Sequence, residues 1–291
     1  MAAASSRRLV RRASHLFALL FALGAASAAT DAAAQAKPNE KKDEKKPAAV
    51  DVKPIVAKIK TGEEGAMKDA FDELRIAGPG GAAAAPAVAE ALSRGLSLSL
   101  TQAAIETLGD LESEAGSAAV AQYATHRNSK VRRAAVKALT RTKGPAASAA
   151  LKRALSDGDA VIRGTAASGL GSIKAKDAVG PLFVALDHRV NEAAASLGQL
   201  CSMEQCEQLA GKLGKLPFDV VTTGLDQVLF RPAAEIPDDA KLKIIGRVRE
   251  LGTIEANKFL RDVQKRWPAA WSGRVRQAID QAVLATSGGA Q

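Results

Sequence analysis

Two cysteines five positions apart, Cys201 and Cys206, are the residues of this chain whose type and spacing point most directly to covalent chemistry. Their segment, CSMEQC, is too widely spaced for a C-x-x-C redox motif, and the chain has no other cysteine to serve as a metal ligand. A chain reversal between them would bring the two β-carbons within bridging distance, which favours a structural disulfide. Two separate buried thiols, or a redox or metal-binding pair, are the alternatives.

Other patterns of catalysis are absent from the sequence. It contains no G-x-S-x-G, no glycine-rich phosphate loop after a strand and no H-E-x-x-H. His126 and His188 lie 62 positions apart, which is two periods of the repeat described below and therefore roughly 20 Å, too far for one metal ion. We therefore predict no catalytic, cofactor-binding or metal-binding residues, no cofactor, and a protein that is not an enzyme.

The two tryptophans of the chain, Trp267 and Trp271, lie close together near its C-terminus and have Arg266 and Arg274 as neighbours. One hypothesis is that both rings cover the apolar end of a helical array, where large aromatic surfaces exclude water. The alternative is a platform that contacts a partner, with the two arginines as its polar companions.

The composition predicts that helices position these residues. The chain has 291 residues, of which 47% are hydrophobic and only 3% aromatic. Ala and Leu are strong helix formers, and Gly, Pro, Asp or Asn interrupt the apolar pattern at short intervals. The sequence therefore predicts an all-α protein made of many short helices.

The spacing of apolar residues repeats with a period of 31. VRRAAVKAL at 131–139 matches IRGTAASGL at 162–170 in pattern rather than identity, and the same offset relates several other positions. A second set of apolar residues follows each of these segments with an i, i+4 spacing. Each repeat is therefore predicted to be a helical hairpin. The recurring positions are Leu100, Val131 and Ile162; Leu108, Leu139 and Leu170; and Val120, Leu151 and Leu182.

Residues that favour helix N-termini recur in the same register, immediately before each expected first helix. Ser97, Asn128 and Asp159 occupy this position, and Asp187 follows 28 residues later. Their side-chain oxygens are suited to accept hydrogen bonds from unpaired amides of the first turn. We therefore interpret these four residues as helix caps.

These segments, together with LKRALSDGDAVIR, resemble HEAT repeats, particularly the short HEAT-like type also found in phycobilisome lyases. The resemblance implies an α-solenoid of stacked antiparallel hairpins, with an Asp before the first helix and an Arg early in it joining neighbouring repeats. Asp159, Arg132 and Arg163 match those positions. Thr101 replaces the Arg in an earlier copy, and HRVNEAAASLG in a later copy departs from the pattern, so we expect no continuous ladder of charges.

The ends of the chain differ in composition from the repeats. Arg7, Arg8, Arg11 and Arg12 precede a short apolar run and small residues, which is typical of a bacterial secretory signal peptide. We predict the following division: a signal peptide and processing region at 1–36, a disordered charged linker at 37–60, HEAT-like repeats at 61–215, divergent helical repeats and a cap at 216–286, and a tail at 287–291.

Net charge limits the classes of partner. The formal charge is +10, and loss of the four signal-peptide arginines leaves 10 − 4 = +6, a mild excess without a basic stripe. The Lys-rich linker is expected to be a solvated tether, with weak contact to an anionic envelope surface as the alternative. We therefore expect no nucleic-acid partner and no transmembrane anchor after cleavage.

The preferred function is a noncatalytic scaffold, exported to the bacterial periplasm or secreted, that binds a protein or peptide partner. A lyase-like enzyme or accessory factor related to HEAT-like lyases is one alternative, and a nucleic-acid-binding repeat protein is another.

Overall fold

The computed structural model describes residues 50–290, and every regular element within them is a helix. Short 3₁₀ turns, η1 to η4, lie between or after the α-helices. The α-helices are α1 (Lys53–Thr61), α2 (Glu64–Ala77), α3 (Ala85–Ser93), α4 (Leu98–Asp110), α5 (Ser117–Tyr123), α6 (Ser129–Thr142), α7 (Gly144–Ala154), α8 (Ala160–Ser172), α9 (Val179–Asp187), α10 (Ala193–Leu200), α11 (Met203–Ala210), α12 (Phe218–Leu229), α13 (Asp238–Glu250), α14 (Ile254–Arg266) and α15 (Gly273–Thr286).

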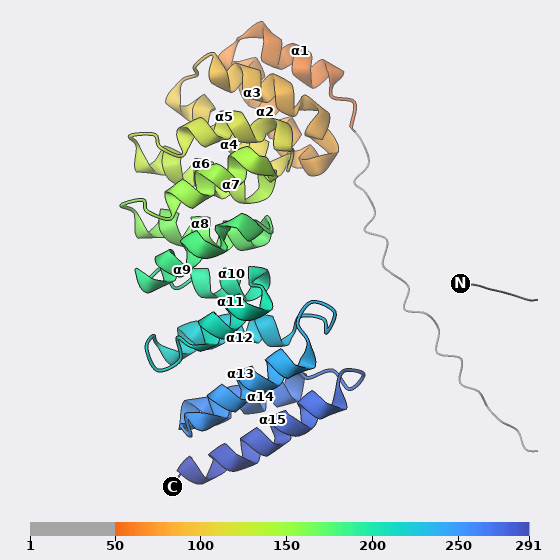
Figure 1. The fold of residues 1–291 in the computed structure, drawn as a ribbon. Helices are drawn as coiled ribbons and strands as arrows, with labels where there is room; N and C mark the ends of the chain where they lie inside the picture. The colour runs from red at the N-terminus through yellow and green to blue at the C-terminus, as the bar shows by residue number, and fades with distance from the viewer. Residues whose placement is uncertain (1–49, 291) are drawn as a thin grey trace, which may run out of the picture. The chain divides into compact units, whose positions relative to one another are not determined.

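These helices form a two-layered solenoid in which consecutive hairpins stack in chain order (Figure 1). The even-numbered helices make the first layer, where α4 packs on α6, α6 on α8, and α10 on α12. The odd-numbered helices make the second layer, where α5 packs on α7 and α13 on α15. The predicted all-α fold of stacked hairpins is therefore confirmed for the described part of the chain.

The residues of the 31-residue register form the core between the two layers. Val131, Ile162, Leu139 and Leu170 are fully buried, as is Leu151 on the second helix of its hairpin. Burying an aliphatic side chain of this size contributes about 1.5–3 kcal/mol, so each residue of the register stabilises the array. The core is continuous along the whole array because each hairpin covers the apolar face of its neighbour.

Two of the four expected caps form as predicted. The side chains of Asn128 and Asp159 accept hydrogen bonds from the amides of Lys130 and Val161, both at 2.9 Å. Ser97 occupies the N-cap position of α4, but its side chain makes no cap hydrogen bond. Asp187 is not a cap, because it is the last residue of α9 and the shortened repeat delays the start of α10 to Ala193.

The structure revises the predicted ends of the array. The signal segment 1–36, and the linker as far as residue 49, lie outside the described residues. The rest of the linker prediction is wrong for 53–60, which belong to α1, because Ile55 and Ile59 bury one face of this Lys-rich helix. In the predicted tail, residues 287–290 form the 3₁₀ turn η4.

Contacts also determine the parity of the C-terminal helices, which the sequence left open. α12 packs against α10 and α14, whereas α13 packs against α11 and α15. α15 is therefore the second helix of the last hairpin. The contacts pass without interruption across residue 215, where the recognisable 31-residue register ends.

Candidate functional site

A cleft of about 1090 Å³ lies along one edge of the solenoid. This edge holds the turns that connect the first helix of each hairpin to the second. The cleft is lined by the ends of α8, α10 and α12 and by the turns that follow them. Three successive hairpins therefore contribute to one site.

Two glycines allow α10 and α12, whose ends line the cleft, to pack closely. Gly198 of α10 and Gly224 of α12 face each other so closely that a β-carbon on either would overlap backbone of the neighbouring helix. In the second layer, by contrast, α9 makes no contact with α7 or α11 as extensive as those that join the first-layer helices. The first-layer helices α10 and α12 are therefore closely packed beside the cleft.

A disulfide between Cys201 and Cys206 shapes one wall of the cleft. The two cysteines flank the turn between α10 and α11, and their Cα atoms lie 5.3 Å apart. Ser202 is the N-cap of α11 and forms a capping box with Gln205. The Ser202 hydroxyl accepts a hydrogen bond from the backbone amide of Gln205, and the Gln205 side chain accepts one from the backbone amide of Ser202. The turn is therefore restrained by both a covalent bond and a cap.

Arg231 joins this turn to the loop between α12 and α13. Its Nη1 donates to the carbonyl oxygens of Cys201, at 2.8 Å, and Gly198, at 3.4 Å. Its Nε donates to Glu235 at 3.1 Å. The guanidinium thus holds three segments of the wall together: the end of α10, the disulfide turn and the loop before α13.

An aromatic cluster lies behind this wall. Phe230 lines the cleft, and its ring centroid lies 5.9 Å from that of Trp267 and 6.2 Å from that of Trp271. Trp267 is only 4% exposed, and its buried Nε1 has no hydrogen-bond partner within the described residues. Both rings face inward, toward α12 and α13. They therefore support the cleft wall and do not cover the free end of α15, where the sequence interpretation had placed them.

A buried lysine completes the cluster. Lys241 of α13 is 1% exposed, and its Nζ donates to the carbonyl oxygen of Arg231 at 2.5 Å. The same ammonium lies 5.5 Å from the ring centroid of Trp267 and 5.0 Å from that of Trp271, within range of cation–π attraction. Burial lowers the pKa of Lys241; Asp238 counteracts this shift and Arg231 reinforces it. The apolar pattern of α13 gave no sign of this role.

Both arginines of the proposed platform already have carboxylate partners. Arg266 pairs with Asp226 at 2.5 Å and with Asp262 at 2.7 Å, and its guanidinium lies 4.6 Å from the ring centroid of Phe230. Arg274 pairs with Asp239 at 2.9 Å on the surface. Of the four residues named from sequence, Trp267, Trp271 and Arg266 thus meet around Phe230, and Arg274 lies apart from them.

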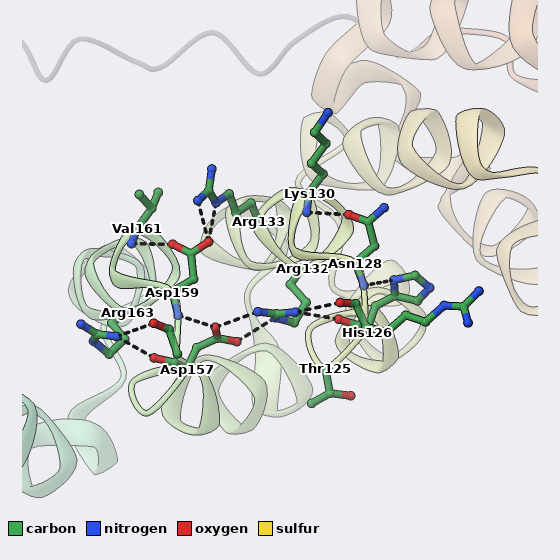
Figure 2. Close-up of polar contacts among 12 residues, drawn as sticks. Thr125, His126, Asn128, Lys130, Arg132, Arg133, Asp157, Asp159, Val161 and Arg163 are labelled. Atoms are coloured by element: carbon green, nitrogen blue, oxygen red, sulfur yellow. Dashed lines mark hydrogen bonds and ion pairs between the residues drawn. The ribbon is translucent and has the colours of Figure 1, made fainter.

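A separate polar network joins α6 to the turn between α7 and α8 (Figure 2). Arg132 forms a bidentate ion pair with Asp157, in which its Nε donates to Oδ2 at 2.9 Å and its Nη2 to Oδ1 at 3.0 Å. Its Nη1 also donates to the backbone carbonyl of His126. Asp159, which matches the family's Asp position, pairs with Arg133 at 2.7 Å. The sequence interpretation did not name Asp157, the carboxylate that Arg132 contacts. Asp157 lies 31 residues after His126 and 31 residues before His188, so the repeat period was the one sequence signal that marked its position.

Arg163 repeats only half of this arrangement. Its Nη1 donates to the carbonyls of Asp157, at 2.8 Å, and Gly158, at 3.1 Å, as Arg132 does in the preceding hairpin. The position one period beyond Asp157 is His188, which has no carboxylate to offer. The bridge to the next hairpin is therefore missing, in agreement with the expected break in the ladder of charges.

Residues 50–290 contain no group of three or more His, Cys, Asp or Glu side chains arranged to hold a metal ion. Over the same residues, no helix combines the length and the apolar character that crossing a membrane requires.

A comparison with known families matches part of the chain. Residues 85–171 match the family profile described as HEAT repeats. None of the curated proteins matches the chain in sequence.

Similar solved structures include the complex of CpcE and CpcF of phycocyanin lyase from Nostoc sp. PCC7120, which is 20% identical and covers 84% of this chain and 99% of that chain, with a TM-score of 0.43. A designed armadillo repeat protein is 13% identical, with coverages of 80% and 98% and a TM-score of 0.40. An engineered protein is 16% identical, with coverages of 81% and 69% and a TM-score of 0.46.

Proposed function

We propose that this protein is a noncatalytic scaffold of the bacterial cell envelope that binds a protein or peptide partner in the cleft across α8, α10 and α12. The observation that carries the proposal is the cleft itself, about 1090 Å³ in volume and open along three consecutive turns. Its length along the edge suits an extended chain better than a compact small molecule. Arrays of helical repeats commonly use such extended surfaces for protein recognition.

The lining has the chemistry that a peptide requires. The side-chain amides of Gln199 and Gln227 carry donors and acceptors that match those of a peptide backbone. Met203, which is 51% exposed, and Phe230 offer apolar contacts in the same cleft. The disulfide and Arg231 restrain the walls before a partner arrives, which lowers the entropic cost of binding.

Export and lack of catalysis are parts of the same proposal. The composition of residues 1–36 supports export, and a disulfide between Cys201 and Cys206 is typical of an oxidising compartment. The noncatalytic assignment rests on the sequence, which lacks the nucleophile, phosphate-loop and zinc-protease motifs named above.

The test is affinity purification of the exported protein from an envelope fraction, followed by mass spectrometry, with one variant that fills the cleft. Gln199→Trp places a bulky ring in the cleft from an exposed position. Gln122→Trp is the matched control, because Gln122 is exposed on α5 and lines none of the described cavities. Partners lost from the first variant and kept by the second support the proposal. An unchanged partner set in Gln199→Trp, or residence of the protein in the cytosol, contradicts it.

A further inference from the structure

Two lysines stand where the cleft meets a second cavity. Lys174 and Lys176, in the turn between α8 and α9, line both the cleft and a neighbouring cavity of about 680 Å³ that reaches Gly144 at the start of α7. The two cavities therefore adjoin at these lysines and form one groove. We call the two cavities together the turn groove.

The turn groove carries an unbalanced positive charge. Its lining contains four basic side chains (Lys152, Lys174, Lys176 and Arg231) and two acidic ones (Asp177 and Glu235), a difference of 4 − 2 = +2. Both carboxylates are already occupied, because Asp177 pairs with Lys152 at 2.5 Å and Glu235 with Arg231 at 3.1 Å. Lys174 and Lys176 are exposed and form no ion pair with any described residue. The excess of two charges thus belongs to them.

The length of the turn groove sets the size of its occupant. It extends over four successive turns, which contain Gly144, Lys174, Ser202 and Pro232. Neighbouring first-layer helices pack about 8–10 Å apart, so three intervals span roughly 25–30 Å. An extended peptide rises about 3.3 Å per residue, so eight or nine residues would fill the groove.

We propose that the turn groove binds an extended acidic segment of a protein partner, in which two carboxylates contact Lys174 and Lys176 and a neighbouring apolar side chain packs on Met203. This inference rests on the proposed function, since it names the chemical class of the partner for the same cleft. Charge complementarity selects the acidic segment, and the side-chain amides of Gln199 and Gln227 contact its backbone.

The backbone at Lys174 offers a way to separate binding from folding. Its φ of +56° is left-handed, a conformation that glycine adopts far more readily than lysine. Lys174→Gly is therefore expected to raise Tm by about 2–4 °C, because the backbone strain is removed from the folded state. The same variant is expected to weaken binding of the acidic segment about threefold or more, because one of its two cationic contacts is lost. A lysine with a purely structural role would not give this pair of opposite effects.

The main experiment selects binders from a phage library of random dodecapeptides on the immobilised protein and measures the enriched peptides by fluorescence anisotropy. We expect enriched peptides to carry two or more Asp or Glu residues close together. Their affinity should fall about tenfold in Lys174→Glu/Lys176→Glu, and also fall as NaCl rises to about 0.5 M. The control, Lys130→Glu/Lys258→Glu, changes the net charge equally at exposed positions outside the groove and should alter affinity less than about twofold.

Three other outcomes would overturn the acidic-segment inference, and they differ in whether the proposed function survives. Peptides that lose binding in Gln199→Trp but show no acidic enrichment would overturn this inference and leave the proposed function standing. Peptides that bind Gln199→Trp unchanged, or no enriched peptide at all, would overturn both. If oligothymidylate displaces the acidic peptides at comparable concentration, the groove is a general polyanion site and the inference fails.

Discussion

Gly198 of α10 and Gly224 of α12 meet with no space between their backbones for even one methyl group. This contact joins α10 and α12, whose C-terminal ends line the candidate cleft. It links the packing of the fold directly to the shape of the site.

Gly198→Ala should therefore destabilise the protein strongly. The new β-carbon would overlap the carbonyl oxygen of Gly224, and relieving that overlap requires α10 and α12 to move apart. Overpacking of this kind costs about 1–3 kcal/mol, occasionally more. Urea unfolding measures the loss. The matched control is Gly246→Ala in the middle of α13, where a β-carbon meets no atom within 4 Å and better helix propensity should stabilise by about 1 kcal/mol. Equal effects of the two substitutions would contradict the close contact.

Asp157→Asn should reduce the acid sensitivity of the protein. Burial alone would raise the pKa of Asp157, but the hydrogen bonds from Arg132 and from the backbone of Asp159 outweigh burial and hold the pKa below its usual 3.8. A carboxylate with a lowered folded pKa contributes stability above its unfolded pKa and loses it as the pH falls through the folded value. The wild-type protein should therefore be the more stable at pH 7, with the difference shrinking on acidification.

Urea unfolding from pH 7 down to about pH 2 checks this expectation. Asp72→Asn serves as the control, since Asp72 is exposed and forms no ion pair with a described residue. A constant difference between wild type and Asp157→Asn across this range would show that the ion pair with Arg132 does not stabilise the joint.

The disulfide should have a small effect on stability. Closing a loop as short as the one between Cys201 and Cys206 stabilises by about 2 kcal/mol in the chain-entropy model. The double substitution Cys201→Ser/Cys206→Ser should lower the unfolding free energy by about that amount. Thiol titration of the unreduced, denatured protein provides a direct check. We expect no reactive thiol in the monomer, and two thiols per chain would disprove the bridge.

Lys241 should make stability depend on pH in the alkaline range. Burial lowers its pKa in the folded state below the ordinary value of 10.5, so the unfolded chain binds more protons between the two values. Unfolding free energy therefore rises with pH across that window, as the buried ammonium loses its charge. Lys241→Met lacks this proton, and its stability should rise less over the same window. Lys265→Met, an exposed position on α14, should follow the wild type. Parallel curves for wild type and Lys241→Met would contradict the effect of burial.

The sequence by itself determined the elements and their order. The 31-residue register of apolar residues such as Val131 and Ile162 predicts helical hairpins, and the burial of these residues follows because they recur on one face of each helix. The disulfide was also within reach, since Cys201 and Cys206 are separated by a single turn. These features depend on residues that are neighbours in sequence or related by a constant period.

Only the tertiary structure decided how the hairpins meet. Gly198 and Gly224 leave space for close contact, but their sequence spacing does not reveal that α10 and α12 use it. Nothing in the sequence around Lys241 marks it as buried, and it becomes so where Trp267 and Trp271 are placed against α13. The cleft depends in the same way on the relative positions of successive helices. Those positions are set by the combined fit of many side chains across two layers, which no local pattern records.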